Sequence, residues 1–224
     1  MLEIKNLVKA FNGRPVLKGV SLQVGPEIKV VVGLNGSGKS TLLKVVAGIL
    51  PADGGQVFLD GKEITSLPPE ERGMGYVPQR PALFPHLSVR QNLLYGLRGK
   101  REDAAWVRQV VDLMGLGEYL DRRPAQLSGG YQSRVALARA LIPRPRAMLL
   151  DEPLSSLDVA IRQKLWEEFH RVLRLLEVPV LYVTHDREEA ERVGESFALL
   201  VGGVVQEVDS ARQAFAALQS GVSA

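Results

Sequence analysis

The chain has 224 residues, 46% of them hydrophobic, which is enough to bury one substantial core. Its formal net charge is only +3 and its basic residues are scattered or paired, so the charge pattern does not indicate a nucleic-acid partner. The absence of cysteine excludes disulfides, thiolate metal sites and cysteine nucleophiles. The segment Met1–Lys5 does not resemble the start of a secretory signal, and no apolar run approaches the ~20 residues that span a bilayer, so we expect a chain that does not enter a membrane alone.

The first ~60 residues alternate apolar and polar side chains with the period of β-strands, for example over Val20–Val24. The pairs Asn12-Gly13 and Asp60-Gly61 are turn signals of β-hairpins. These patterns predict an N-terminal antiparallel β subdomain.

A phosphate-binding loop follows the next predicted strand. Val30–Val32 is a β-branched run suited to a strand buried on both faces, and Ser40–Ala47 has the pattern of a helix that Gly48 stops. Between them, Gly33–Thr41 matches the P-loop pattern, whose glycines let backbone N–H groups wrap a chain of phosphates. The alternative, an ordinary glycine-rich turn, does not account for a strand and a helix on either side.

The P-loop match assigns roles to individual residues. Lys39 would reach the β- and γ-phosphates of a nucleotide, and the hydroxyl of Ser40 would bind Mg²⁺. The helix that begins near Lys39 adds the positive end of its dipole. The residues of this loop that we expect to bind the nucleotide are Asn35, Gly36, Ser37, Gly38, Lys39, Ser40 and Thr41.

A second phosphate-binding element, Leu127–Gly130, opens a helix in the region 89–141, where apolar residues recur at helical spacing. Ser128 fits the N-cap position of that helix, a role that is compatible with a functional one. Gly129 and Gly130 leave the helix N-terminus bare, so that its amides can close on a γ-phosphate. Since the P-loop already serves the chain's own nucleotide, we expect Ser128, Gly129 and Gly130 to serve the nucleotide of a second copy.

Two further apolar runs, Ala147–Leu150 and Val180–Val183, are typical of buried parallel strands, and polar residues follow each of them. The first run ends at Asp151 and Glu152, and the second ends near His185. Because ligands of open α/β sheets bind outside the carboxyl ends of the strands, we expect these side chains to converge with the P-loop on one crevice.

In that crevice, Asp151 would hold hydrated Mg²⁺ and Glu152 would polarise the attacking water, whereas an isolated Asp-Glu pair is more often a solvated strand end. His185 would hydrogen-bond the γ-phosphate and the water, although a histidine after a strand is commonly an ordinary core or surface residue. His86 and His170 have no comparable placement and receive no role.

Beyond these strands, an amphipathic stretch at 161–176 predicts a crossover helix, Gly202-Gly203 predicts a closing hairpin and 211–218 a short final helix. The predicted fold class is α/β: a P-loop NTPase with a mainly parallel central sheet, an N-terminal antiparallel β subdomain and a helical subdomain that carries Leu127–Gly130. We expect a single domain over residues 1–224, with the helical subdomain at about 88–146 and no C-terminal regulatory domain.

In their order along the chain, these motifs resemble those of the nucleotide-binding subunits of ATP-binding-cassette (ABC) transporters. The resemblance covers nearly the whole chain: Leu127–Gly130 is similar to the signature motif of the family, Gln79 to its Q-loop glutamine, Ser155–Asp158 to its D-loop and His185 to its switch histidine. The resemblance implies that Glu152 is the general base of ATP hydrolysis.

The same resemblance implies that Phe11 stacks on the adenine of ATP with Val16 beside it, and that Gln79 senses Mg²⁺ and the attacking water. It also implies that Ser156 and Asp158 act as D-loop residues. The implied side-chain ligands on the Mg²⁺ side of the site are Ser40, Gln79 and Asp151.

Two segments, Leu67–Gln79 and Leu83–Val89, look most like those of importer ATPases for molybdate, tungstate or sulfate. The implied protein is an ATPase that uses ATP and Mg²⁺ and is bound peripherally at the cytoplasmic face of the cell membrane. Its implied partners are a second copy in a head-to-tail dimer, transmembrane permease subunits and, indirectly, an extracytoplasmic solute-binding protein. Tyr131 stands where the signature motif often has glutamine, and this departure bears on fine tuning only.

The apolar residues Leu83, Phe84 and Leu87 look exposed and are our candidate dock for a helix of a membrane partner; the alternative is a local packing cluster. A DNA-repair or chromosome-organising ATPase is the leading rival function, but the short stretch between the Q-loop and the signature motif has no sustained heptads. A soluble regulatory ATPase and a small-molecule kinase are further alternatives, although a kinase would not need the signature motif.

Overall fold

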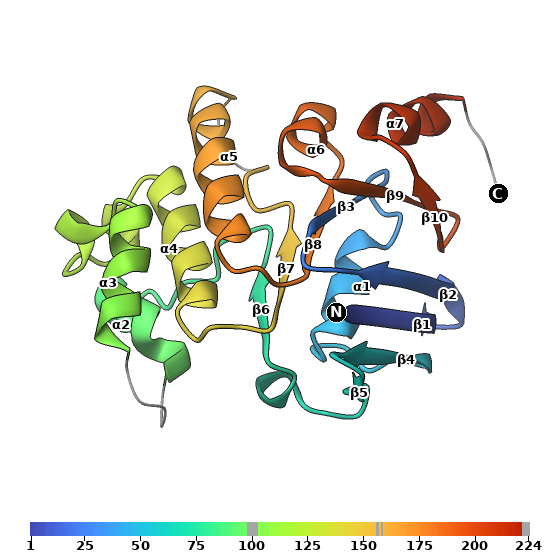
Figure 1. The fold of residues 1–224 in the computed structure, drawn as a ribbon, viewed down its shortest axis with the longest axis horizontal. Coiled ribbons are helices and arrows are strands. Elements are labelled where there is room, and N and C mark those ends of the chain that lie inside the picture. The colour runs from blue at the N-terminus through green and yellow to red at the C-terminus, as the bar shows by residue number, and fades with distance from the viewer. Residues whose placement is uncertain (98–102, 156, 158, 221–224) are drawn as a thin grey trace.

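The computed structural model describes residues 1–97, 103–155, 157 and 159–220, which form two β-sheets with helices packed around the larger sheet (Figure 1). The strands are β1 (Leu2–Phe11), β2 (Arg14–Val24), β3 (Ile28–Val32), β4 (Gly54–Leu59), β5 (Lys62–Glu63), β6 (Met74–Val77), β7 (Ala147–Asp151), β8 (Val180–Thr184), β9 (Ser196–Val201) and β10 (Val204–Val208). The α-helices are α1 (Lys39–Val46), α2 (Val89–Leu94), α3 (Ala104–Leu113), α4 (Gly129–Leu141), α5 (Val159–Arg174), α6 (Arg187–Val193) and α7 (Ala211–Gln219).

The N-terminal sheet has the strand order β2-β1-β4-β5, and its neighbouring strands pair antiparallel. The turn from β1 to β2 contains Asn12 and Gly13 at φ values of 50° and 76°, and the turn from β4 to β5 contains Asp60 and Gly61 at 50° and 77°. Positive φ at both central residues is what a tight hairpin requires, and these residue types tolerate it. The predicted antiparallel subdomain and both of its hairpin turns are therefore confirmed.

The central sheet has the strand order β10-β9-β3-β8-β7-β6. Five of these strands run parallel, and β10 is an antiparallel edge strand that returns from β9 through Gly202-Gly203. The amide of Lys18 in β2 donates a 2.8 Å hydrogen bond to the carbonyl of Gly203, so the two sheets are joined at this turn. The mainly parallel sheet is as predicted.

The central sheet separates two apolar cores, because successive side chains of its strands point to opposite faces. Val31, Leu149 and Leu181 face a core shared with α1 and the N-terminal sheet. Val30 and Leu150 face a second core, shared with helices α2 to α7. Figure 1 shows α1 on the side of the N-terminal sheet and α2 to α4 gathered into a separate helical lobe. With both faces covered, the carboxyl edge of the parallel strands remains for a ligand.

Among the described residues of the region 89–141, three α-helices, α2, α3 and α4, are present where a helical region was predicted. Polar side chains explain two of the helix starts. Ser88 forms a capping box with Gln91 at the start of α2, and the carboxylate of Asp103 accepts a hydrogen bond from the Trp106 amide at the start of α3. Within the described part of the chain, none of the helices is both long and apolar enough to cross a membrane.

Two predicted helix boundaries were wrong by one or two residues. The first helix begins at Lys39, as the P-loop match predicts, since Gly38 is its N-cap at a φ of 104°, but it ends at Val46 rather than Ala47. The crossover helix ends at Arg174, before Leu176. Leu176 nevertheless packs against the core, so its apolar character marks burial in the turn that follows the helix.

Candidate functional site

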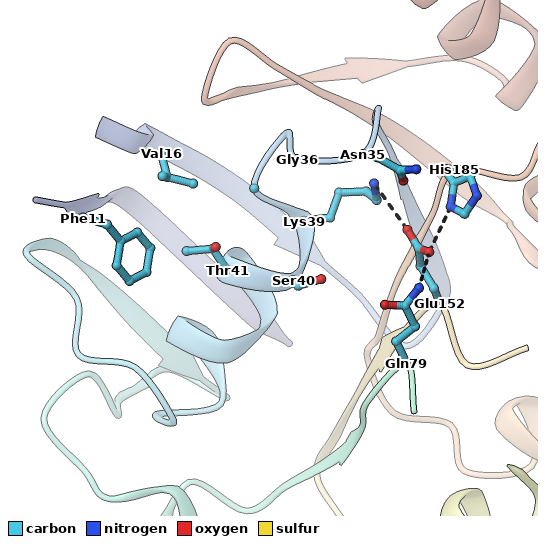
Figure 2. Close-up of a pocket in the computed structure, with 11 residues that line it drawn as sticks. Phe11, Val16, Asn35, Gly36, Lys39, Ser40, Thr41, Gln79, Glu152 and His185 are labelled. Atoms are coloured by element: carbon cyan, nitrogen blue, oxygen red, sulfur yellow. Dashed lines mark hydrogen bonds and ion pairs between the residues drawn. The ribbon is translucent and has the colours of Figure 1, made fainter. Parts of the chain in front are cut away.

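A cavity of about 480 Å³ opens at the carboxyl ends of the parallel strands, a volume in the range of small-molecule sites (Figure 2). The residues that line it are Phe11, Val16, Asn35, Gly36, Gly38, Lys39, Ser40, Thr41, Gln79, Glu152 and His185. The fold thus brings the P-loop together with residues that follow β6, β7 and β8. Figure 2 shows Phe11 and Val16 at one end of this site and His185 at the other.

The P-loop depends on glycine at two positions in particular. A Cβ at Gly33 would lie 2.8 Å from the carbonyl oxygen of Leu200 on the neighbouring strand. Gly38 has a φ of 104°, and a Cβ there would lie 3.0 Å from the side chain of Val16. A side chain at Gly33 would collide with the neighbouring strand, and one at Gly38 would have to adopt a backbone conformation that L side chains rarely take, so both glycines fit the loop to its position.

Lys39 points back over the loop that precedes it. Its ammonium group donates to the carbonyl oxygens of Gly33 and Leu34 at 2.8 and 3.0 Å, and it lies 3.3 Å from Glu152 Oε1. The side chain is only 5% exposed. A buried cation at the start of helix α1, beside a glycine-rich loop, is suited to binding an anion.

Asp151 lies behind the cavity wall and connects two elements. Its Oδ1 accepts a 2.8 Å hydrogen bond from the hydroxyl of Ser40, and its Oδ2 accepts a 3.2 Å bond from the hydroxyl of Tyr76. Burial raises the pKa of the Asp151 carboxyl, and the hydrogen bonds from Ser40 and Tyr76 oppose that rise. Burial and the nearby Asp151 charge also raise the pKa of Tyr76.

Glu152 is the centre of the polar contacts in the cavity (Figure 2). Its Oε2 lies 2.9 Å from His185 Nδ1 and accepts a 3.2 Å hydrogen bond from the Gln79 amide, while its Oε1 faces Lys39. Its backbone has a φ of 45°, an uncommon conformation for a residue with a side chain. Backbone strain of this kind is concentrated at functional sites, and here it turns the Glu152 carboxylate into the cavity.

The second predicted glycine motif lies elsewhere in the molecule. Among the described residues that line the cavity, none belongs to Leu127–Gly130. Ser128 occupies the N-cap position of α4, as predicted, but its side chain makes no capping hydrogen bond. Gln132 holds this turn instead, because its side-chain amide donates to the carbonyl oxygens of Pro124 and Leu127 at 3.2 Å each. The expected capping role of the Ser128 hydroxyl is therefore wrong.

Besides Asp151 and the glycine motif, one further predicted site residue lies outside this cavity and two lie outside the described residues. Ser37 does not line the cavity, and its hydroxyl is buried without a hydrogen-bond partner among the described residues. Ser156 and Asp158 of the predicted D-loop fall on positions that the structure does not describe.

Phe11, which lines the cavity as predicted, is half-exposed, and the ammonium group of Lys9 lies 5.5 Å from its ring centroid.

The segment that follows Gln79 is less exposed than its sequence indicates. Leu83, Phe84 and Leu87 are each partly buried. The ring of Phe84 lies 4.1 Å from that of Tyr95, centroid to centroid, and its amide donates a 2.8 Å hydrogen bond to Asn92. The prediction of an exposed cluster was therefore wrong, because local packing covers part of each side chain.

Two residues of the site were missed by sequence reasoning. Tyr76 reaches Asp151 from the neighbouring strand, and Ser155 accepts a 3.3 Å hydrogen bond from Gln79 and donates one to the Glu152 carbonyl at 2.9 Å. Tyr76 lies within the segment Leu67–Gln79 and Ser155 within the predicted D-loop, Ser155–Asp158. Only the strand register and the turn after β7 show which of their neighbours they contact.

Comparisons with known proteins agree with this geometry. A family model described as ABC transporter matches residues 17–155. The molybdate/tungstate import ATP-binding protein WtpC of Archaeoglobus fulgidus is 46% identical over 200 residues, which cover 88% of this chain and 83% of that protein. The Fe(3+) ions import ATP-binding protein FbpC 2 of Haemophilus influenzae (strain Rd) is 42% identical over 222 residues, which cover 95% of this chain but only 62% of that protein.

A solved structure, the dimeric structure of MJ0796, a bacterial ABC transporter cassette, superposes with a TM-score of 0.81 at 28% identity, covering 95% of this chain and 99% of that one. Fold and cavity thus define a P-loop ATPase with an added helical lobe. The chain belongs to the ABC transporter family, as an ATP-binding subunit. The family resemblance drawn from its motifs is confirmed.

Proposed function

We propose that this chain is the ATP-hydrolysing subunit of an importer, peripheral at the cytoplasmic face of the membrane, and that the imported solute is an oxyanion such as molybdate or tungstate. The support for import is that relatives at 42 to 46% identity are named as import ATP-binding proteins. The support for the oxyanion is that WtpC proteins from two organisms are among them. These relatives give no support to a DNA-repair or regulatory ATPase.

In the proposed reaction, the P-loop amides and Lys39 bind the β- and γ-phosphates of ATP, and Phe11 stacks on the adenine beside Val16. Glu152 takes a proton from the attacking water, and His185 orients that water against the γ-phosphate. The 2.9 Å contact between His185 and Glu152 supports this division of roles, because one water can lie within reach of both groups. Gln79, which donates to Glu152, completes the ring of side chains around the water.

The donors around the phosphate end of the cavity fit Mg²⁺. The hydroxyl of Ser40, the carboxylate of Asp151 and the amide of Gln79 all offer oxygen, the ligand type that this ion prefers. Magnesium commonly binds to one or two protein groups and to substrate phosphates, so a large carboxylate cluster is not needed. When bound, it would neutralise charge that develops on the phosphate oxygens. Ser40 and Asp151 are already joined by a hydrogen bond, which keeps both at the same edge.

The main support for the proposal is that the described lining of the cavity contains the P-loop side of an ATP site without the signature motif. Among the described residues, its lining includes the P-loop, Gln79, Glu152 and His185 but no part of Leu127–Gly130. In a head-to-tail dimer, Ser128, Gly129 and Gly130 of one chain would face the γ-phosphate held by the other. ATP then favours the closed dimer because it contacts both chains, and hydrolysis removes that preference.

The membrane partner of the proposed transporter would contact a groove of about 690 Å³ beside Phe84. Tyr95, Glu70 and Arg139 also line this groove, so it combines apolar surface with charged side chains of both signs. A short amphipathic helix of a permease subunit fits such a surface. We propose further that an extracytoplasmic solute-binding protein delivers the solute, and that residues 1–224 act as one domain with a helical subdomain at about 88–146.

Complementation between two inactive variants tests the shared site. Lys39→Ala disables the P-loop and Ser128→Arg blocks the signature motif, so each homodimer should be inactive. Mixed one to one, half of the dimers would contain one intact site of two, so we expect about a quarter of the wild-type ATPase rate. The control is the double variant Lys39→Ala/Ser128→Arg mixed with either single variant, in which no dimer has an intact site and the mixture should stay inactive. A mixture of single variants that stays inactive would reject the shared site.

A further inference from the structure

A chain of hydrogen bonds lies beneath His185, inside the protein. Glu189 on α6 is 1% exposed, and its carboxylate accepts a 2.6 Å hydrogen bond from the hydroxyl of Tyr182 and another from the hydroxyl of Thr184. Tyr182 and Thr184 belong to β8, the strand that leads directly into His185. The Glu189 carboxylate is therefore hydrogen-bonded to two side chains at the end of β8.

The direction of these hydrogen bonds is determined by their donors. The amide of Asp186 donates to the hydroxyl oxygen of Thr184 at 3.0 Å, so this hydroxyl uses its own proton toward Glu189. The carboxylate of Asp186 accepts from the Glu189 amide at 3.0 Å and closes the loop. Thr184, on one side of His185, thus bonds the buried carboxylate directly, and Asp186, on the other side, is connected to it through the Thr184 hydroxyl.

A neighbouring helix contributes to this arrangement. Arg162 on α5 lies 3.1 Å from Asp186 Oδ2, and both side chains are largely buried. The backbone that carries His185 is consequently held from β8, from α6 and from α5. In Figure 2 the imidazole of His185 faces Glu152, with Nδ1 at 2.9 Å from the carboxylate.

A buried carboxylate is a costly element in an apolar core. Burial raises the pKa of Glu189, and the hydrogen bonds from Thr184 and Tyr182 act in the opposite direction. Anchoring α6 alone does not require a charge, because Ala190 and Val193 already bury its apolar face. A carboxylate does provide two acceptors at a fixed separation, which two hydroxyl donors from one strand can use together.

We propose that Glu189 is a positioning residue: through Thr184 and Asp186 it fixes the backbone on both sides of His185, so that the imidazole meets Glu152 and the γ-phosphate of ATP. This inference rests on the proposed role of His185 in hydrolysis. Glu189 itself touches neither the nucleotide nor the water. Its effect on turnover is transmitted entirely through the histidine.

The variant Glu189→Gln tests the inference with little change of shape. A glutamine side chain has one acceptor oxygen and an NH₂ group that donates, so one of the two hydroxyls of β8 meets a donor instead of an acceptor. We expect kcat for ATP hydrolysis to fall roughly 10- to 100-fold while the KM for ATP changes less than about twofold, since only the histidine loses its alignment. The matched control is Glu191→Gln, which removes an exposed carboxylate of the same helix that pairs with Arg187.

A double-mutant cycle with His185→Ala separates positioning from general stability. If Glu189 acts through His185, then Glu189→Gln lowers kcat in the wild-type background and has no further effect when His185 is already alanine. Equal loss of kcat in both backgrounds, or wild-type kcat in Glu189→Gln, overturns the inference. Tyr182→Phe, which removes one donor and keeps the ring, serves in the same cycle should Glu189→Gln not fold.

The same measurements distinguish this inference from the proposed function. His185→Ala with wild-type kcat would reject the role of the histidine in the proposed reaction and, with it, the positioning role of Glu189, while Lys39, Glu152 and the ATPase function would stand. His185→Ala with strongly reduced kcat, together with an unaffected Glu189→Gln, rejects only the positioning role. Reduced kcat in both single variants without additivity in the double variant supports the two proposals together.

Discussion

The two phosphate-binding elements of this chain are built in opposite ways. At the sheet edge, Lys39 and Glu152 contact each other and their neighbours within one chain, and both are more than nine-tenths buried. At the start of α4, the Ser128 side chain is exposed and makes no capping bond. The side chains of the first element are thus fixed by contacts within their own chain, whereas the Ser128 hydroxyl of the second element is exposed and free of a capping bond. That contrast is what a site completed by a second copy requires.

The largest effect that this comparison predicts is at the sheet edge. In Glu152→Gln the proton acceptor for water is lost, so we expect kcat to fall ~10²- to 10⁴-fold. The φ of 45° at this position suits glutamine as well as glutamate, so the fold should be retained. Turnover, ATP binding and the amount of dimer in ATP, measured by light scattering, check the prediction.

The expected phenotype of Glu152→Gln is binding without hydrolysis, with dimers that accumulate in ATP. Glu118→Gln, at an exposed carboxylate of the helical lobe, is a control that should retain wild-type turnover. Turnover close to wild type in Glu152→Gln would show that Glu152 is not the general base. The contrast between the two phosphate-binding elements would then need another explanation.

A smaller effect on hydrolysis, but a clear one on transport, is predicted for the proposed dock. Phe84→Glu places a charge in the groove that Arg139 lines, and Leu87→Glu places one next to Phe84, whose carbonyl accepts a 3.2 Å hydrogen bond from the Leu87 amide, so a permease helix would lose apolar contact. We expect transport by the assembled complex to fall by roughly tenfold or more, while ATPase activity of the isolated subunit is kept. Leu175→Glu, at an exposed leucine after α5, is the control. A complex that transports normally with both dock variants excludes this groove as the contact.

Much of the fold follows from the sequence because its signals are local. The runs Val30–Val32 and Ala147–Leu150 are apolar on both faces, and only a covered parallel strand needs that. The glycines of the P-loop and of the hairpin turns mark backbone conformations that other residues avoid. Strands, turns and their order could therefore be predicted before their partners were known.

The contacts made across strands could not be predicted in this way. Tyr76 meets Asp151 only because of the register of β6 on β7, and no spacing along the chain encodes that register. Ser128 is of a residue type preferred at the N-cap, yet its hydroxyl caps nothing, and the turn is stabilised by Gln132, whose side chain donates to two carbonyl groups. Glu189 resembled an ordinary residue of a helical first turn, and only the packing of α6 on β8 reveals its buried partners.

The smallest predicted effect concerns how the signature helix is held from behind. The rings of Tyr131 and Tyr119 lie 4.1 Å apart, and the guanidinium groups of Arg134 and Arg122 lie over them at 5.5 and 4.8 Å. Tyr131→Gln restores the residue common in the motif but removes this stack, so we expect Tm to fall by about 2 °C and turnover to stay within about twofold.

Tyr131→Phe keeps the ring and loses only the hydroxyl that meets Tyr119, so its Tm should lie between those of wild type and Tyr131→Gln, which makes it the control for the loss of stacking. The two readouts then decide where Tyr131 acts. If Tyr131→Gln lowers turnover by tenfold at an unchanged Tm, the phenol acts on the ATP of the partner chain, and the start of α4 contributes more to the site than Ser128, Gly129 and Gly130. A small loss of Tm alone assigns Tyr131 to the support of α4, and the outward-facing element then consists of Ser128 and Gly129, with Gly130 buried behind them.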